Sequence, residues 1–570
     1  MGVMNRIKHF EDSLNKNRVK KLLFSIPWVI GCLVVMLYLF KRGQFRYESN
    51  DDLFLSFIVN GIYGEYYKYN MFNSFPLSLL FSTLYSISRT VNWFFLYYYC
   101  FIVLSYIVFG VWNICRNRII VAYLTSMLFV VSTYNALITR MNFSKSASII
   151  IAVGYLLFVS SVDGEIYKRK WNIALRIVSY VFIIGGFLIR WDTCLASLPF
   201  LIVLIVYVFL NNNKQFKCII PFIGIFVVLV VIWGSNYIAY NTDKDWKNWA
   251  EYNSVRAGLL DYYTGDYDGS EELYKEIGIS RNDFEALDSW IYADDEVYDL
   301  DTMKKLAEIR DQSYAKYLKI NKQNIESAIL NSLDLFKYYL VIFVVIFLIL
   351  MTIPLLKGKD SLVLISLFVL CFGEIFYLVF HQRCPERAFY LPIMVLFVMV
   401  IYFMAKAKGR NEWSIIFSIV CILTFIFYGS NFYTINRSEG FAYVDREETI
   451  SMLKELSSRE DKLYVWDGHE RDILRYVFSP KDVPQFGLEK NFVMLGGWSV
   501  PSPIMSERAE LFGEKYNYLR LLAYNGNVNY ITKSDEYLGI IEQYIREHYN
   551  PDVKAELIET VNGFKIYSFV

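Results

Sequence analysis

Two adjacent carboxylates, Asp51 and Asp52, stand shortly after the first apolar run of the chain, residues 22–40. Closeness and partial burial would raise the pKa of one carboxyl towards neutrality, so that it could take a proton from a reacting group. The same residues fit a plainer role, because "SNDD" ahead of "LFLSFIVNGI" is good helix-capping chemistry. Both interpretations require a helix that begins beside the acids.

Charged residues also gather in short links between apolar runs, in "ITRMNFSKSAS", "LIRWDTCLAS" and "VFHQRCPERAFYLP". Ionisable groups beside a hydrocarbon layer are costly, which makes them candidates for function. Snorkelling, or a structural Arg190–Asp192 pair, is the alternative explanation. An arginine can hold two oxygens of a phosphate at once, so these links are candidates for anion binding. The residues are Arg140, Lys145, Arg190, Asp192, His381, Arg383, Glu386 and Arg387.

Membrane helices are the elements that must position these residues. Of 570 residues, 55% are hydrophobic and 18% aromatic, whereas soluble domains are roughly 45–50% apolar. A membrane span needs about 20 mostly apolar residues, and about eleven segments qualify. The sequence therefore predicts a polytopic α-helical membrane protein. The predicted spans are 22–40, 91–114, 119–138, 146–162, 173–191, 194–210, 218–238, 336–355, 361–380, 388–404 and 412–431.

The orientation follows from lysines and arginines in the short links, which are retained in the cytoplasm. Because the clusters fall on every second link, residues 1–21 are predicted to be cytoplasmic, and an odd number of spans puts the C-terminus outside the plasma membrane. The first span is predicted to remain uncleaved. The clusters are Arg18, Lys20 and Lys21; Arg116 and Arg118; Lys168, Arg169 and Lys170; Lys214 and Lys217; Lys357 and Lys359; and Lys406, Lys408 and Arg410.

Three large pieces then share the outer face, two within the membrane domain 22–431 and one after it. The loop 41–90 contains amphipathic segments, 53–64 and 75–88, which are expected to lie in the interface plane as a shelf with the two acids at its edge. The acidic loop 239–335 is interpreted as a solvated helical cap with helices near 270–277 and 301–325. Ser280 is its predicted N-cap.

The tail 432–570 alternates strands and helices, which predicts a small extracytoplasmic three-layer α/β domain. Its strands are "KLYVWD", "NFVML" and "VNYIT", and the segment "AELIETVNGFKIYSFV" is predicted to form a hairpin that turns at Asn562-Gly563. Helices are expected at "RDILRYVF", at "EYLGIIEQYIREHY" and, as one continuous helix, at "ERAELFGEKYNYLRLLAY". "LGGWSVPSP" is too weak for a phosphate-binding loop.

Composition also excludes several classes of protein. The net charge is +1 and no long basic block is present, which argues against nucleic acid as a partner. All eight cysteines lie in or beside apolar runs. A disulfide framework is therefore not expected, and the cysteine spacings fit no zinc site.

The acidic pair at the start of the first outer loop, the juxtamembrane helices and "NWFF" at the start of the second span resemble the GT-C superfamily of integral-membrane glycosyltransferases. The layout matches as well, with the N-terminus inside, about eleven spans and substantial outer parts. The loop 239–335 is similar to that of uncharacterised membrane proteins from Gram-positive bacteria, which indicates a bacterial cell envelope.

The resemblance implies that a hexose or pentose passes from a polyprenyl-phosphate donor to a cell-surface glycopolymer or glycolipid on the outer face. No inner link is large enough to bind a soluble nucleotide sugar, so a lipid-linked donor fits. Asp51 would be the general base, with Asp52 its orienting partner or substitute. The cations would bind the departing phosphate. Some relatives use a divalent metal ion there, but Asp51 and Asp52 alone provide too few ligands to predict one.

Other functions use similar parts. A transporter or flippase for lipid-linked polysaccharide would show repeats and charges at mid-depth, and no repeat is evident. A surface-polysaccharide polymerase or ligase shares the lipid-phosphate substrates, but the long loop here is acidic. A non-enzymatic surface-binding protein would rely on its tail alone. The effect of Asp51→Asn on turnover separates these alternatives.

Overall fold

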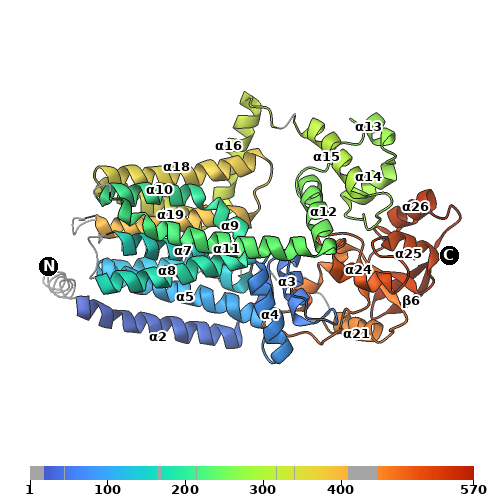
Figure 1. Cartoon of the computed structure of the whole chain (residues 1–570), viewed down its shortest axis with the longest axis horizontal. Helices are drawn as coiled ribbons and strands as arrows, with labels where there is room; N and C mark the ends of the chain where they lie inside the picture. Colours follow the sequence, from blue (N-terminus) through green and yellow to red (C-terminus); the bar gives the residue numbers. More distant parts are fainter. Residues whose placement is uncertain are drawn as a thin grey trace.

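The computed structural model describes residues 18–43, 45–163, 169–212, 215–315, 318–338, 340–407 and 446–570. Long helices lie side by side in one half of the molecule, and a smaller unit with a β-sheet lies at the other end, next to the C-terminus (Figure 1). The chain is a multi-pass helical membrane protein with a small α/β unit. The fold class predicted from the sequence is confirmed.

The helical half contains 8 described helices long and apolar enough to cross a membrane. Every predicted span within the described residues coincides with an apolar helix; the span 412–431 lies outside them. The long helices are α2 (Arg18–Arg42), α5 (Trp93–Arg116), α6 (Ile119–Tyr134, continued by η1, Asn135–Thr139), α7 (Phe143–Val162), α8 (Arg169–Ile189), α11 (Ile220–Thr242), α18 (Lys359–Phe380) and α19 (Glu386–Lys406). The shorter pieces are α9 (Trp191–Ala196), α10 (Leu198–Asn211), η2 (Phe216–Cys218), α17 (Leu340–Thr352) and η3 (Ile353–Leu355).

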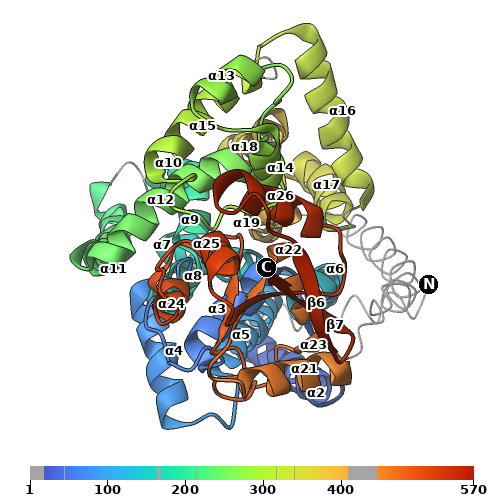
Figure 2. The ribbon, with the colours of Figure 1, turned by 90° about the vertical axis from the view of Figure 1, so that its right-hand side faces the viewer.

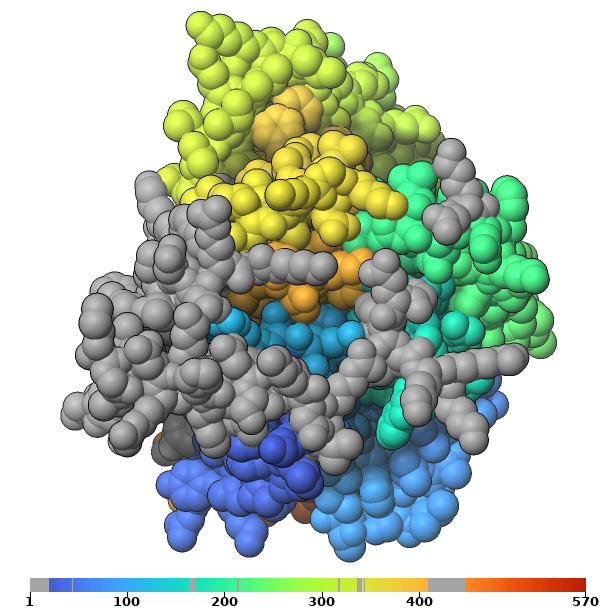
Figure 3. Space-filling model, turned by 90° about the vertical axis from the view of Figure 1, so that its left-hand side faces the viewer, coloured from blue at the N-terminus to red at the C-terminus, as the bar shows by residue number. Residues whose placement is uncertain are grey.

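Helix α7 forms the centre of the bundle, since every one of its residues is buried. Helix α19 packs against α7 and is buried along most of its length. Helices α2 and α11 are peripheral and expose leucine, valine and isoleucine side chains. Lipid solvates such a surface without the penalty that water would impose. In the end-on view of Figure 3, orange α19 lies between the blue and the yellow helices.

The predicted lysine clusters meet at the end of the bundle away from the sheet. Lys21 Nζ donates to the carbonyl of Asn117 at 2.5 Å, and Lys359 Nζ donates to that of Leu210 at 3.0 Å. Lys406 forms an ion pair with Asp163 at 2.6 Å. Because these contacts join links distant in sequence, the basic clusters share one end of the bundle. Lys168, Lys214, Lys408 and Arg410 lie outside the described residues.

The large loops and the tail gather at the opposite end, so the predicted grouping of these pieces on one side is consistent with their positions (Figure 1). The loop after α2 forms β1 (Arg46–Tyr47), α3 (Asn50–Asn60) and α4 (Phe75–Ile87). β1 pairs in parallel with β2 (Arg140–Met141), which follows η1. This short pairing holds the start of α3 against the start of α7.

Helix α3 is not the interfacial shelf that its sequence predicts. Its residues from Asp52 to Asn60 are all buried, in part because the tail packs against Phe54 and Phe57. The guanidinium of Arg471 lies 4.1 Å from the centre of the Phe54 ring, and the Phe57 and Phe478 rings are 5.4 Å apart. Helix α4 does have one buried and one exposed face, and the exposed face includes Leu79 and Ile87.

The tail contains a five-stranded sheet in the order β4-β3-β5-β7-β6. β3 pairs in parallel with β4 and β5, and β7 is antiparallel to both β5 and β6. Asn562 and Gly563 form the predicted turn with φ of 47° and 80°, as a tight hairpin requires. The strands are β3 (Leu463–Trp466), β4 (Phe492–Met494), β5 (Val528–Thr532), β6 (Ala555–Val561) and β7 (Phe564–Phe569).

Helices accompany these strands, and two of them differ from the prediction. The helix predicted at "RDILRYVF" is interrupted at Asp472 and Ile473, between two short helices. The helix predicted at "ERAELFGEKYNYLRLLAY" is divided into α24 and α25, with Gly513 between them at a φ of 114°. A residue with that φ cannot continue a right-handed helix. The helices are α21 (Arg446–Ser457), α22 (Gly468–Arg471), α23 (Leu474–Val477), α24 (Pro503–Glu510), α25 (Tyr518–Tyr524) and α26 (Leu538–His548).

The acidic loop is helical, as predicted, but the helix expected near 301–325 ends at Tyr314. The loop packs against the tail instead of standing free in solvent. Seen from the sheet end, α12–α15 lie on one side of the sheet of the tail, and α4 and the tail's own α21 lie on the other (Figure 2). The predicted cap Ser280 accepts a hydrogen bond from the Asp283 backbone at 3.0 Å. The helices are α12 (Lys244–Leu260), α13 (Glu271–Glu276), α14 (Arg281–Asp288), α15 (Leu300–Tyr314) and α16 (Lys322–Tyr338).

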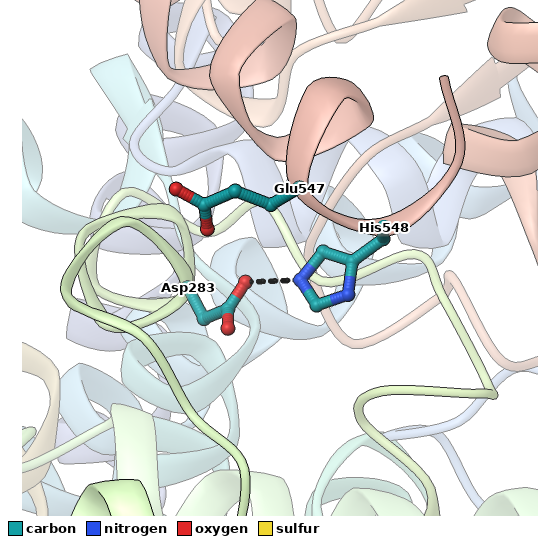
Figure 4. A group of neighbouring side chains, drawn as sticks. All are labelled: Asp283, Glu547 and His548. Carbon is teal, nitrogen blue, oxygen red and sulfur yellow. Dashed lines mark hydrogen bonds and ion pairs between the residues drawn. The ribbon is translucent and has the colours of Figure 1, made fainter. Parts of the chain in front are cut away.

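A side-chain cluster joins this loop to the last helix of the tail. His548 Nε2 lies 2.7 Å from Asp283 Oδ1, and Glu547 lies beside them (Figure 4). The ligand atoms of the three lie within 4.8 Å of one another, as a metal site would need. Ser280 already donates to both carboxylates, from its N–H to Asp283 and from its hydroxyl to Glu547. The cluster is therefore explained as a contact that fixes α14 on α26.

Candidate functional site

Asp51 lies in the first turn of α3, directly after the N-cap residue Ser49 and Asn50. Arg387 of α19 donates to Asp51 Oδ2 at 3.0 Å. Trp498 Nε1 donates to Asp51 Oδ1 at 2.8 Å from the loop after β4. The Asp51 side chain is 16% exposed. The loop after α2, helix α19 of the bundle and the tail thus meet on one carboxylate.

Asp52 faces the other way and is fully buried. It accepts from the Ser49 hydroxyl at 2.7 Å and the Ser49 N–H at 3.2 Å, which is the helix-capping role that the sequence suggests. It also accepts from the Phe143 N–H at 2.7 Å and from Asn142 at 3.2 Å. Burial raises the pKa of Asp52 to about 7, while the hydrogen bonds from Ser49 and Phe143 oppose that rise. Asp52 therefore ties α3 to α7.

A cavity of ≈ 780 Å³ opens between the helical bundle, the acidic loop and the tail. Asp51 lines it, as do Arg190 just after α8, Asp192 in α9, Arg383 from the link between α18 and α19, and Arg387 at the start of α19. The tail contributes His469 and Trp498 to the wall. The structure thus brings together residues that are far apart in the sequence.

Arg190 forms part of this wall through several contacts. Its Nη2 lies 3.8 Å from Asp192 Oδ2, and its guanidinium lies 4.5 Å from the centre of the Phe143 ring and 5.5 Å from that of Phe72. Burial lowers the pKa of Arg190 from its usual value. The pair suggested by the sequence exists, but it faces the cavity, so the structural and functional roles are compatible.

The link "HQRCPER" divides its basic groups between different partners. Arg383 donates to Asp261 Oδ2 at 2.8 Å, and its guanidinium lies 4.4 Å from the centre of the Tyr262 ring. Asp261 also accepts from Arg256 Nη1 at 2.9 Å. The His381 ring lies against the Tyr377 carbonyl at 2.9 Å, and His381 does not line the cavity.

Lys145 is placed differently from the other candidates. It is fully buried and forms ion pairs with Glu48 at 2.5 Å and with Glu386 at 2.7 Å. Two carboxylates thus surround its ammonium, which leaves it no direction open to a phosphate. Arg140 lies in β2, and neither Arg140 nor Lys145 lines the cavity.

Sequence analysis missed several residues of the wall: His469, Trp498, Arg256 and Asp261. The best signal was the glycine pair of "LGGWSVPSP". A side chain at Gly496 would place its Cβ 1.6 Å from the Trp290 carbonyl oxygen, and Gly497 has a φ of 103°. The glycines let the loop approach the acidic loop closely, which presents Trp498 to Asp51.

The cavity wall offers separate carboxylates to a cation. Asp51, Asp192 and Asp261 each form an ion pair with an arginine. Among the described residues of this wall, no three carboxylate or histidine ligand atoms come together as they do at Asp283, Glu547 and His548. A metal ion at the cavity stays an open expectation.

No model of a known protein family matches the sequence, and the comparison with curated proteins found no match. The comparison with solved structures found the crystal structure of ArnT from Cupriavidus metallidurans bound to undecaprenyl phosphate. The TM-score is 0.44 at 10% sequence identity, over 95% of this chain and 98% of that one. So distant a likeness does not indicate an activity for this chain.

Proposed function

We propose that this protein is a GT-C-type glycosyltransferase that moves a sugar from a polyprenyl-phosphate donor to a cell-surface glycopolymer or glycolipid. The reaction takes place on the extracytoplasmic face. The observation that carries the proposal is the cavity in which the Asp51 carboxylate meets Arg387, with Arg190 and Arg383 on the same wall. A base and several phosphate-binding groups around one opening are what such a transfer requires.

Asp51 acts as the general base. An acceptor hydroxyl attacks the anomeric carbon of the donor, and its proton passes to the Asp51 carboxylate. The bond between that carbon and the phosphate oxygen breaks, and its electron pair leaves with the polyprenyl phosphate. Trp498 orients Asp51 through the 2.8 Å hydrogen bond to Oδ1.

Arg387 links the base to the phosphate. In the structure it is held by Asp51 at 3.0 Å, and Arg383 is held by Asp261 at 2.8 Å. A donor phosphate competes with these carboxylates, because arginine binds phosphate in the same forked geometry as carboxylate. When the phosphate draws Arg387 away, Asp51 Oδ2 can accept a hydrogen bond from the acceptor hydroxyl in its place. Donor binding thus opens the base to the acceptor.

The donor's lipid tail needs a path from the membrane to these arginines. Helix α18 ends at Phe380, just before Arg383, and it exposes Val369 and Tyr377 on its outer surface. An apolar chain lying along α18 would deliver its phosphate to the start of the link. This arrangement favours a lipid-linked donor over a soluble one.

The Asp51→Asn variant tests the proposal. Loss of the base should lower kcat by about 10²–10⁴-fold, while binding of polyprenyl phosphate to the purified protein is retained. Turnover is followed by mass spectrometry of glycans after incubation with lipid-linked sugars. Asp288→Asn is the matched control, since Asp288 is exposed and lies outside the cavity. Unchanged turnover in Asp51→Asn would refute the assignment of the base.

A lipid-linked polysaccharide flippase and a polymerase or ligase are the alternatives. A flippase would move its cargo without breaking the anomeric bond. Neither the wild type nor Asp51→Asn would then cleave any donor. A polymerase would use the same chemistry but would add many units to one acceptor, which the product masses distinguish. The arginines of the cavity lie at the ends of the membrane helices or beyond them and not at mid-depth, which favours chemistry over transport.

A further inference from the structure

A second, smaller cavity of ≈ 320 Å³ lies beside the reaction cavity. Its wall is formed by α12 of the acidic loop, the segment between α14 and α15, and the tail on both sides of α24. None of the residues that line it belongs to a membrane helix. The cavity is therefore separate from the membrane and from the proposed lipid path.

Aromatic rings make up much of this wall, and hydrogen bonds fix several of them. Trp249 Nε1 donates to the Trp498 carbonyl at 2.8 Å, and the Tyr252 hydroxyl donates to the Tyr298 carbonyl at 3.0 Å. Tyr516 of the tail completes the aromatic part of the lining. Rigid rings of this kind bind an amphipathic ligand at low entropic cost.

The charged residues of the wall are all acidic: Asp294, Asp295 and Asp299. The carboxylate of Asp294 is already used, since it accepts from Asn517 at 2.8 Å and from Tyr544 at 2.9 Å. Asp299 caps α15 by accepting from the Thr302 N–H at 2.7 Å. Among the described residues, no side chain forms an ion pair with Asp295. The Asp295 side chain is exposed, so its carboxylate is open to a ligand.

The two cavities are divided by one segment of the tail. Gly497 and Trp498 line the reaction cavity, whereas Val500 and Pro501 line the second one. Trp498 joins the two, because its carbonyl accepts from Trp249 and its indole donates to Asp51. A chain of sugars passing this segment could occupy both cavities at once.

We propose that the second cavity binds one sugar unit of the acceptor glycan, a unit without negative charge and preferably one that bears a protonated amine. The aromatic faces would pack against the C–H face of the ring, and Asp295 would pair with the amine. The acidic wall would repel uronate or phosphate groups. The binding site is argued from the cavity itself; that its ligand is the acceptor rests on the proposed function.

Oligosaccharide binding to the full-length protein in detergent tests this site. The probes are a glucosamine tetramer, cellotetraose and a galacturonate tetramer. Their binding is measured by isothermal titration calorimetry in the absence of any donor. We expect the glucosamine tetramer to bind about tenfold more tightly than cellotetraose, as one charge-assisted hydrogen bond allows, and the galacturonate tetramer not to bind. Asp295→Asn should remove the tenfold difference, and Tyr516→Ala should weaken both ligands.

Asp288→Asn is the control and should bind as the wild type does. Two results would overturn the inference. One is that the glucosamine tetramer does not bind, and the other is that its binding is abolished by Asp51→Asn but left intact by Asp295→Asn. The two proposals can fail separately. Saccharide binding as expected without sugar transfer would refute only the proposed function, and transfer without this binding would refute only the second site.

Discussion

Asp51 and Asp52 are neighbours in the chain but have different surroundings. Successive residues of a helix point about 100° apart, so one carboxylate reaches the cavity while the other is turned towards the start of α7. Asp51 touches groups that a substrate could displace, Arg387 among them. Asp52 touches Ser49, Asn142 and the Phe143 backbone, which belong to the fold. The first is suited to chemistry and the second to positioning.

Asn substitution should therefore affect the two positions in opposite ways. In Asp52→Asn an NH₂ group replaces one accepting oxygen, so a buried donor loses its partner at a cost of about 1–3 kcal/mol. We expect a lower midpoint of thermal unfolding in detergent, with turnover per folded molecule largely retained. Asp51→Asn should instead lower turnover and keep the unfolding midpoint of the wild type. An unchanged unfolding midpoint with lost turnover in Asp52→Asn would instead make Asp52 part of the chemistry.

The loop between β4 and α24 shows how one short element determines the shape of the site. Gly496 lets its backbone pass close to Trp290, and Gly497 takes a positive φ that side chains disfavour. The loop then carries Trp498 to Asp51 and Val500 to the second cavity. Moving this loop would change both cavities together.

Gly496→Ala should disturb this loop. Its new methyl group would overlap the Trp290 carbonyl oxygen, and relieving such overpacking costs about 1–3 kcal/mol. We expect a lower unfolding midpoint and reduced Trp498-to-Asp51 contact, seen as a change in tryptophan fluorescence. Gly526→Ala is the control, since a Cβ there would meet nothing within 4 Å. Equal stability of the two variants would contradict this account of the glycine pair.

The whole molecule has two unlike ends. Lys21, Lys359 and Lys406 make their contacts at one end of the bundle. The acidic loop and the tail lie at the other end (Figure 1). This asymmetry is what the retention of positive charge in the cytoplasm would produce. The proposed reaction depends on it, because a lipid-linked donor is needed where nucleotide sugars are absent.

Cysteine labelling of intact cells tests this orientation. Asp288 and Lys217 are both exposed and lie in parts predicted to be on opposite sides of the membrane. We expect a membrane-impermeant maleimide to label Asp288→Cys in intact cells and Lys217→Cys only after permeabilisation, each compared with the wild type. The reverse pattern would put the cavity in the cytoplasm and remove the argument for a lipid-linked donor.

The sequence by itself determined those features that depend only on residues close together in the chain. The apolar runs predicted the spans, alternation predicted strands β3–β5, Asn562-Gly563 predicted the hairpin, and Ser280 was identified as a cap. It also singled out Asp51, Arg190, Arg383 and Arg387, because charge beside an apolar run is visible locally.

Only the tertiary structure decided which of these residues meet. Arg387 and Trp498 are 336 and 447 residues from Asp51, and no local pattern records such a pairing. The apolar pattern of α3 suits a membrane surface as well as a buried interface, so its burial depended on the tail that covers it. In the sequence, Lys145 and Arg387 are both cations in short links beside apolar runs. In the structure, Lys145 is buried and pairs with Glu48 and Glu386. The helices follow from local periodicity, whereas the cavity follows from packing between distant segments.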